Sequence, residues 1–169
     1  MPSALNRNFT IPDHWKLQPT SRMCFVCGRE NGTGLQLKFY EDREAQKVYC
    51  PLWIPADYQG YPGITHGGIL ATILDEISGR ALALHLGGEV FWVTAKMEVR
   101  YRKPTPTEQP LMAVGWVVET RRRSAIVGGA IHLPDGSVSA EVESVIVRPD
   151  RKTLVAWLGS EEAAEWKVV

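Results

Sequence analysis

The residue types most able to do chemistry gather in the segment PGITHGGILATILDEISGR, residues 62–80. A histidine and two glycines come first, and an apolar run with two adjacent acids, Asp75 and Glu76, follows. Burying a carboxylate among apolar neighbours costs free energy unless the group meets a partner or takes part in a reaction. Each of the two acids therefore needs an explanation.

Glu76 has an ordinary explanation. Arg80 lies four residues later, in the favourable order for an ion pair along a helix, so we expect the two side chains to pair at the solvent edge. Asp75 has no basic residue three or four positions away. The residues at those positions are small: Ala71, Thr72, Ser78 and Gly79. A structural role, bonded to nearby groups, is the ordinary alternative, but the space beside Asp75 makes it the candidate catalytic carboxylate.

His66, Gly67 and Gly68 open the same helix. The first N–H groups of a helix have no partner within it, and the helix dipole is positive there. Glycine lets a ligand oxygen approach those groups, so this terminus can hold a phosphate or polarise a carbonyl that is under attack. The alternative is that the glycines only permit close packing and that His66 is a cap or core residue.

The distance between these two features indicates a dimer. His66 and Asp75 are nine residues apart, about 13 Å along a helix, which is too far for both to act easily on one carbonyl. Two antiparallel helices related by a two-fold axis would set the glycine N–H groups of one subunit opposite Asp75 of the other. We therefore expect a homodimer whose sites are shared between subunits.

One long helix and an antiparallel sheet are the elements that must position these residues. The apolar run predicts a helix over about 68–86, and the following glycine pair predicts its end. Alternating apolar residues predict strands at about 35–40, 48–54, 93–102, 111–120, 124–133 and 138–147. This tally indicates an α+β fold with the helix laid on the sheet.

Length and charge restrict the class of protein. The 169 residues fit one domain, and we expect an N-terminal arm over 1–34, a folded unit over 35–150 and a tail over 151–169 with a short helix. Nineteen basic and nineteen acidic residues leave no net field to attract nucleic acid or a membrane. Neither a signal-like leader nor a membrane span is visible, so we expect a cytoplasmic protein with a small anionic ligand.

Three cysteines, Cys24, Cys27 and Cys50, do not make a disulfide framework. Cys24 and Cys27 form one CxxC motif, but a structural zinc site usually has two such pairs, and no thioredoxin-like context surrounds this one. A zinc site is therefore the less favoured alternative. We expect buried thiols and no metal.

The segment HGGILATILDE resembles that of the hotdog-fold acyl-CoA thioesterases of the PaaI-like, or phenylacetyl-CoA thioesterase, type. Two further segments, CFVCGRENGTGLQLKF and VTAKMEVRYRKPTP, are similar to other parts of these proteins, so the likeness covers about residues 24–148. The resemblance implies a hotdog fold over 35–150, with five to six antiparallel strands wrapped around one central helix. It also implies dimers with a continuous sheet, often paired into tetramers.

The resemblance also assigns catalytic roles. It implies that Asp75 is the general base or the nucleophile, that the Gly68 N–H polarises the thioester carbonyl, and that His66 orients the loop or the substrate. Thr94 stands where the family often has a Ser or Thr near the attacking water. Simple strand alternation, however, turns Thr94 to the polar side of its strand.

The expected substrate-binding residues are less specific. The Asn or Gln that often precedes the HGG loop falls near Gly60 in this chain, with Gln59 adjacent. The anionic tail of coenzyme A needs cations at the mouth of the site. The candidates are Lys103, Arg121, Arg122 and Arg123. For each of them a solvated turn between strands is an equally good explanation.

These observations predict an enzyme that hydrolyses acyl-CoA or aryl-CoA thioesters and needs no cofactor beyond the coenzyme A of its substrate. A thioester carbonyl is reactive enough for one carboxylate and an N–H oxyanion site, and no G-x-S-x-G segment is present. The alternative is a non-catalytic acyl-CoA binding or sensing module. Hydratase chemistry is disfavoured, because its His–Asp dyad is placed differently.

Overall fold

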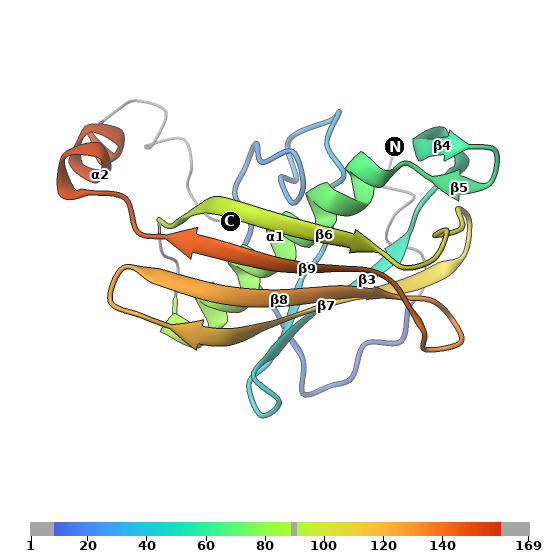
Figure 1. Cartoon of the computed structure of the whole chain (residues 1–169), viewed down its shortest axis with the longest axis horizontal. Helices are drawn as coiled ribbons and strands as arrows, with labels where there is room; N and C mark the ends of the chain where they lie inside the picture. Colours follow the sequence, from blue (N-terminus) through green and yellow to red (C-terminus); the bar gives the residue numbers. More distant parts are fainter. Residues whose placement is uncertain (1–8, 89–90, 160–169) are drawn as a thin grey trace.

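A single antiparallel sheet dominates the fold (Figure 1). The computed structural model describes residues 9–88 and 91–159. Its sheet has seven strands in the order β1-β2-β3-β7-β8-β9-β6. Their bounds are β1 Lys16–Leu17, β2 Tyr40–Asp42, β3 Lys47–Trp53, β6 Val93–Tyr101, β7 Pro110–Thr120, β8 Ser124–His132 and β9 Val138–Val147. Strand β6 closes one edge of the sheet, so its outer side has no strand partner within the described chain.

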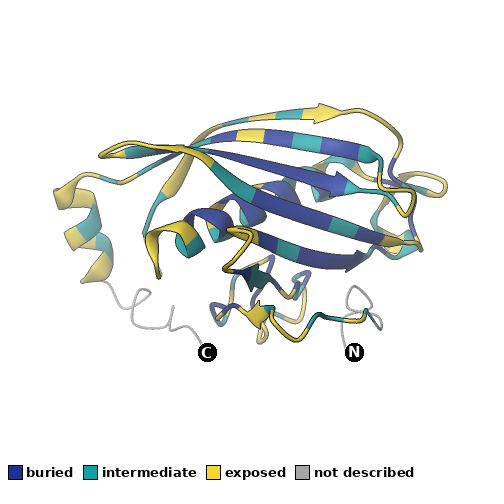
Figure 2. Cartoon of the chain, turned by 90° about the horizontal axis from the view of Figure 1, so that it is seen from below, coloured by how far each residue is buried: buried dark blue, intermediate teal, exposed yellow. Residues whose placement is uncertain are grey.

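The long helix α1, Gly67–Leu86, lies against one face of this sheet (Figures 1 and 2). Its inward residues, among them Ile73 and Ile77, are fully buried. Helix and sheet come very close at Gly115 of β7, where an added Cβ would lie 2.7 Å from the carbonyl oxygen of Ile77. The buried hydroxyl of Ser144 on β9 donates to that of Ser78 at 3.2 Å. These contacts fix the rotation of α1, and hence the direction in which its outer residues point.

A short hairpin and a second helix complete the described elements. Strands β4, Gln59–Tyr61, and β5, Ile64–Thr65, pair just before α1, after the 3-10 turn Ala56–Tyr58. Helix α2, Arg151–Leu158, follows the sheet, and the Asp150 side chain caps it by accepting from Thr153 N–H. Residues 1–8 and 160–169, which belong to the expected arm and tail, lie outside the described residues.

This architecture confirms the expected α+β hotdog fold. The helix and the strands after it occur within a residue or two of the predicted bounds. The predicted strand at 35–40 is wrong: β2 begins only at Tyr40. Gln36 adopts a left-handed backbone (φ 51°), which an extended strand does not allow. The N–H groups of Leu35 and Leu37 instead donate to carbonyls of Phe25 and Val26 in the arm.

The N-terminal arm is part of this packing. Cys27 and Val26 belong to the same buried cluster as Leu35, Leu37 and the inward residues of α1. The arm also adds the two-residue strand β1 beside β2, so the sheet has seven strands where five to six are expected. No helix in the described part of the chain is long and apolar enough to cross a membrane.

Candidate functional site

His66 is the N-cap of helix α1. Its backbone is extended (φ −63°, ψ 133°), and its Nδ1 accepts a hydrogen bond from Gly68 N–H at 3.0 Å. A ring nitrogen that accepts carries no proton, so in this arrangement the ring N–H is on Nε2. Both the imidazole and Gly68 are exposed. The Gly68 N–H is therefore engaged by the cap, whereas the Gly67 N–H has no partner among the described residues.

Tyr101, on strand β6, holds the first turn of the helix. Its hydroxyl donates to the carbonyl oxygen of Gly67 at 2.9 Å. A Cβ on Gly67 would lie 3.4 Å from the tyrosine ring, so this glycine lets the ring close over the helix start. Sequence reasoning assigned Tyr101 no role in the site. The sequence feature that could have indicated such a role is the position of Tyr101 at the end of the predicted strand VTAKMEVRY.

Asp75 meets Thr94 at the other end of β6. The Thr94 hydroxyl donates to Asp75 Oδ1 at 2.7 Å, and both residues are exposed. No cation pairs with Asp75 among the residues that the structure describes, and the Thr94 hydroxyl is the one side-chain donor that bonds its carboxylate there. Such a carboxylate is held in place and still available to accept a proton or to attack.

A β-bulge explains why Thr94 reaches the helix. Thr94 pairs with Ile146, and Lys96 pairs with Val145, so Ala95 is an extra residue in β6. Paired residues of antiparallel strands point to the same face, and Ile146 is a buried core residue. The bulge therefore turns Thr94 to the helix side. The alternation rule placed it on the polar side, which is wrong because the extra residue Ala95 shifts the alternation by one between Thr94 and the rest of the strand.

The loop before the helix is fixed by local bonds. The Gln59 Oε1 accepts from Gly63 N–H at 3.0 Å, so this side chain closes its own hairpin. Gly60 faces the cap: a Cβ there would lie 3.3 Å from Cδ2 of His66. Gly60 is thus the residue beside His66, whereas the side-chain amide of Gln59 bonds the backbone of its own loop.

The predicted basic residues lie at two opposite ends of the sheet. Lys103 follows β6 at the Tyr101 end, with its N–H bonded to Ser139 O. The Arg121–Arg123 turn joins β7 to β8 near the Thr94 end, because Ser124 pairs with Val147, which pairs with Val93. All four side chains are exposed, and Arg121 pairs with Glu119 at 2.7 Å. One chain does not bring Lys103 and the arginines together.

The surroundings of Glu76 differ from those predicted from the sequence. It pairs with Arg80 at 2.9 Å as expected, but the pair is not at the solvent edge: the two side chains are 20% and 14% exposed. The arm covers them, since Arg80 also donates to Pro19 O and to Cys27 Sγ. The prediction failed because an arm without periodicity gives no sign of where it packs.

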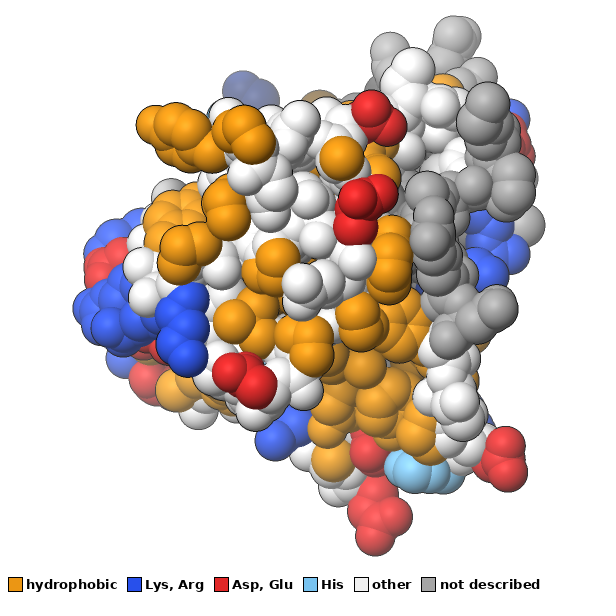
Figure 3. Space-filling model, turned by 90° about the vertical axis from the view of Figure 1, so that its right-hand side faces the viewer, with side chains coloured by type: hydrophobic (Ala, Val, Ile, Leu, Met, Phe, Trp, Pro, Cys, Tyr) orange, Lys and Arg blue, Asp and Glu red, His pale blue; other side chains and the backbone are white. Residues whose placement is uncertain are grey.

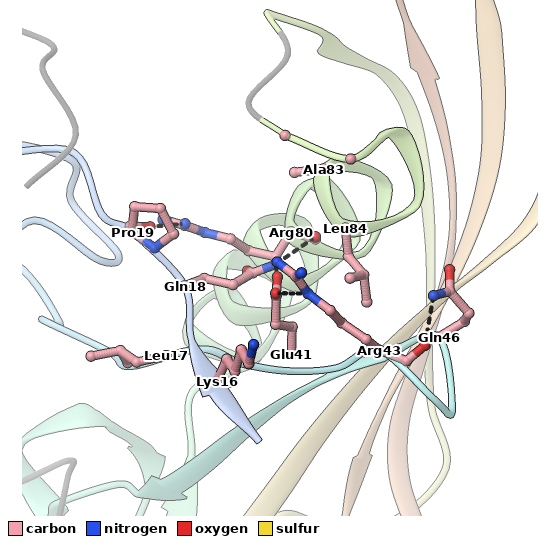
Figure 4. Close-up of a pocket in the computed structure, with 12 residues that line it drawn as sticks. Lys16, Leu17, Gln18, Pro19, Glu41, Arg43, Gln46, Arg80, Ala83 and Leu84 are labelled. Carbon is pink, nitrogen blue, oxygen red and sulfur yellow. Dashed lines mark hydrogen bonds and ion pairs between the residues drawn. The ribbon is translucent and has the colours of Figure 1, made fainter. Parts of the chain in front are cut away.

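A cavity of about 470 Å³ lies beside this covered pair (Figure 4). The arm, strand β2 with the turn that follows it, and the last turns of α1 form its walls, including Lys16, Arg43, Arg80 and Leu84. In the close-up, Glu41 accepts from Gln18 and from Arg43. The cavity is at the far end of α1 from His66, so it is not part of the predicted site. At the other end, where β4, β5 and the start of α1 lie, hydrophobic side chains reach the surface (Figure 3).

The described residues contain one group that could hold a metal. Ligand atoms of Cys24, Cys27 and Glu76 lie within 4.8 Å of one another. Cys27 is buried and Cys24 is half-buried, and both are free thiols. This group is on the arm side of α1 and does not include Asp75 or His66.

The geometry is that of two half-sites on one chain. One half has a helix N-terminus, the His66 imidazole and Tyr101, and the other has Asp75 with Thr94. The first can polarise a carbonyl and the second can supply a base or a nucleophile.

Comparisons with known proteins show what the chain as a whole is similar to. Residues 62–140 match the family model of the thioesterase superfamily. Acyl-coenzyme A thioesterase THEM4 of Xenopus laevis is 36% identical over 78 residues, which cover 46% of this chain and 33% of that protein. The protein of the same name from Bos taurus is 30% identical over 82 residues, 48% of this chain and 32% of that one. This chain thus spans about a third of the length of these relatives.

Solved structures show the same fold. A crystal structure of a thioesterase superfamily protein has a TM-score of 0.68 and 32% identity, over 75% of this chain and 60% of that one. A phenylacetic acid degradation-related putative thioesterase from Ralstonia eutropha has a TM-score of 0.57 and 18% identity, over 63% and 80% of the two chains. The resemblance inferred from the HGG segment is confirmed.

Proposed function

We propose that this chain, which carries the thioesterase-superfamily segment 62–140, hydrolyses acyl-coenzyme A thioesters to the free acid and coenzyme A. The observation that carries the proposal is the exposed Asp75 carboxylate, held by Thr94 at 2.7 Å and free of any cation among the described residues. The THEM4 relatives, which are acyl-coenzyme A thioesterases by name, support the substrate class.

The reaction needs a nucleophile and a polarised carbonyl. Asp75 either takes a proton from an attacking water or attacks the thioester carbon itself, and Thr94 holds the carboxylate in either case. The carbonyl oxygen accepts from the N–H of Gly67, or from that of Gly68 once the imidazole turns aside. When water attacks, the proton that Asp75 has taken passes to the leaving thiolate. When Asp75 attacks, the thiolate leaves and an acyl–aspartyl anhydride forms. Water then hydrolyses this anhydride, which releases the acid and restores Asp75, and the thiolate takes its proton from that water.

A two-fold dimer through β6 would assemble complete sites. Strand β6 has nine residues on an unpaired sheet edge, and most of its side chains are exposed. Long exposed edges normally pair or are covered. Antiparallel pairing with the same strand of a second copy sets the Thr94 end of one chain beside the Tyr101 end of the other. Asp75 of one subunit then lies near His66 of its partner.

The same dimer would bring the basic residues at the two ends of the sheet close to one another. Lys103 follows the Tyr101 end of β6, and the Arg121–Arg123 turn lies near the Thr94 end. Across a two-fold axis the two groups approach one another at each site. Together they supply positive charge for the phosphates of coenzyme A.

The first experiment measures turnover of a panel of acyl- and aryl-CoA thioesters by the wild type and by Asp75→Asn. We expect hydrolysis by the wild type and a loss of about 10²- to 10⁴-fold in the variant, with the oligomeric state unchanged. Full turnover by Asp75→Asn would refute the assignment. Binding of the panel without hydrolysis by the wild type would favour a non-catalytic binding module instead.

The second experiment tests whether sites are shared. Asp75→Asn subunits are mixed with His66→Ala subunits, unfolded and refolded together. If each site uses Asp75 of one chain and His66 of the other, a mixed dimer has one intact site, and the mixture regains roughly a quarter of the wild-type rate. If both residues act within one chain, every site keeps a lesion and no activity returns.

A further inference from the structure

Two thiols, a carboxylate and a guanidinium meet where the arm crosses helix α1. The sulfur atoms of Cys24 and Cys27 and a carboxylate oxygen of Glu76 lie within 4.8 Å of one another. Arg80 donates to Cys27 Sγ at 2.7 Å and to Glu76 Oε1 at 2.9 Å. The proposed hydrolysis uses none of these four groups.

The CxxC segment is a tight turn that activates one sulfur. Gly28 N–H donates to Cys24 O at 2.9 Å, and Val26 N–H donates to Cys24 Sγ at 3.3 Å. A hydrogen bond from the Cys27 thiol, helped by backbone N–H groups, lowers the pKa of Cys24 to about 6, although partial burial and the charge of Glu76 oppose this. The same hydrogen bond and burial raise the pKa of Cys27. A thiolate is the nucleophilic form of cysteine.

Access also distinguishes the three thiols. Cys24 is partly exposed, and its neighbours Met23 and Phe25 are 59% and 48% exposed. Cys27 is 1% exposed and Cys50 is fully buried, where desolvation raises the pKa of its thiol. A reagent in solution therefore reaches Cys24 first.

We propose that Cys24 and Cys27 form a thiol–disulfide exchange site, in which Cys24 attacks a low-molecular-weight disulfide and Cys27 resolves the product. The Cys24 thiolate attacks one sulfur of RS–SR, a mixed disulfide forms, and RS⁻ leaves and takes up a proton. Cys27 loses its proton to solvent and attacks Cys24 Sγ, and the second RS⁻ leaves. Two protein thiols are thereby oxidised, and the small disulfide is reduced to two thiols.

The same cluster disfavours a metal. A structural zinc ion takes four ligands, and the described residues bring only three ligand atoms together here. The Arg80 guanidinium already occupies the space beside Cys27 Sγ. A cation at that place would meet a positive charge at short range.

Oxidation of the two thiols to a disulfide would change the contacts that they make with helix α1. A disulfide sulfur has no proton to donate and accepts more weakly than a thiol, so the disulfide removes the contact in which the Cys24 thiol donates to Glu76 at 3.7 Å, and it weakens the bond from Arg80 to Cys27 Sγ. Arg80 also bonds Pro19 O of the arm and lines the cavity in Figure 4. Exchange at the CxxC turn thus loosens the arm beside the residue that follows Asp75.

The deciding experiment treats the full chain with oxidised glutathione and follows intact mass. Wild type and Cys50→Ala should each form an internal disulfide and retain no glutathione. Cys27→Ser should stop at a stable mixed disulfide on Cys24, and Cys24→Ser should react at least about tenfold more slowly. A lasting mixed disulfide on the wild type, or fast reaction of Cys24→Ser, would overturn the proposal. So would a stoichiometric zinc ion that protects both thiols in the purified protein.

A second readout uses alkylation of Cys24 by iodoacetamide, located by peptide mapping in Cys50→Ala. The groups that face this thiol are Cys27 from the turn and Glu76 from α1, and Arg80 of α1 bonds the neighbouring Cys27. The rate should rise with pH through about 6. Adding Cys27→Ala removes the hydrogen bond, and the midpoint should move toward the ordinary thiol value of about 8.5. An ordinary midpoint while Cys27 is present would show that Cys24 is not activated.

The link to α1 has its own test. Amide hydrogen exchange in the arm, residues 17–39, is compared between the reduced and the disulfide form of Cys50→Ala. We expect faster exchange in the disulfide form, since Arg80 then holds the arm by fewer bonds. Equal exchange in both forms would refute the coupling while leaving the exchange chemistry in place.

Discussion

Asp75 and Glu76 are adjacent in sequence, yet α1 turns them toward two different surroundings. Glu76 faces the arm, where Arg80 neutralises its charge and the pair is mostly covered. Asp75 faces the exposed edge strand β6, where one neutral hydroxyl holds it. The Glu76 carboxylate joins the arm to the helix through Arg80, and the Asp75 carboxylate stays exposed with no cation paired to it among the described residues.

This difference shows that the groups around a carboxylate decide its role more than whether the residue is Asp or Glu. A carboxylate that is paired with a guanidinium is stabilised as an anion and makes a poor base. A carboxylate that accepts one hydroxyl hydrogen bond is oriented without being neutralised. The four predictions below change the two acids or the groups that hold the two half-sites, and each has a matched control variant.

Exchanging each acid for its amide should separate the two roles most strongly. Asp75→Asn should lower kcat for thioester hydrolysis by about 10²- to 10⁴-fold and change the free energy of unfolding by less than about 0.5 kcal/mol, because the residue is exposed. Glu76→Gln should keep most of the activity at a temperature where the variant is folded. Equal losses of kcat in both variants would remove the distinction.

Arg80→Met should break the covered pair. The substitution leaves Glu76 without its cation in a largely buried place, so we expect a loss of about 3 kcal/mol in the free energy of unfolding, measured by urea denaturation. The matched control is Arg100→Met, which removes an exposed pair with Glu98 and should change stability by less than about 0.5 kcal/mol. If the two arginine variants are equally stable, the arm does not depend on this pair.

Thr94→Val should weaken the hold on Asp75 without removing the carboxylate. The lost hydrogen bond to a charged group corresponds to about 1.5 kcal/mol, or roughly tenfold in kcat. Thr94→Ser keeps the hydroxyl and should restore most of the rate, while KM changes little in either variant. A Thr94→Ser variant as slow as Thr94→Val would point to the methyl group in place of the hydroxyl.

Tyr101→Phe should have the smallest effect. It removes the hydroxyl that bonds Gly67 O and keeps the ring that packs on this glycine. We expect a loss of about 0.5–1 kcal/mol, or two- to fivefold in kcat/KM, through looser placement of the helix N-terminus. Tyr101→Ala, which also removes the ring, should lose more. Unchanged kcat/KM in Tyr101→Ala would exclude a positioning role.

Much of the fold could be predicted because its signals are local. The helix over 67–86 is a continuous apolar run with a glycine stop, and β6 to β9 alternate along their lengths. That Thr94 lies near the site could be predicted only from the family resemblance. Simple strand alternation placed its side chain on the polar side of the strand, away from the helix. The extra residue at Ala95 reversed that direction, and a bulge has no sequence signal as regular as a period.

The sequence by itself determined which groups are present and how far apart they lie along the helix. Spacing and residue type singled out His66 and Asp75 as candidates, matched Glu76 to Arg80, and placed the end of α1, since each depends on neighbours within a few residues. Only the tertiary structure decided that the arm covers the Glu76–Arg80 pair, brings Arg80 to Cys27 and leaves Asp75 open. The bonds from the arm to Arg80 join residues 53 and 61 positions apart, and the bond between Thr94 and Asp75 joins residues 19 apart. Local patterns carry no information about such contacts.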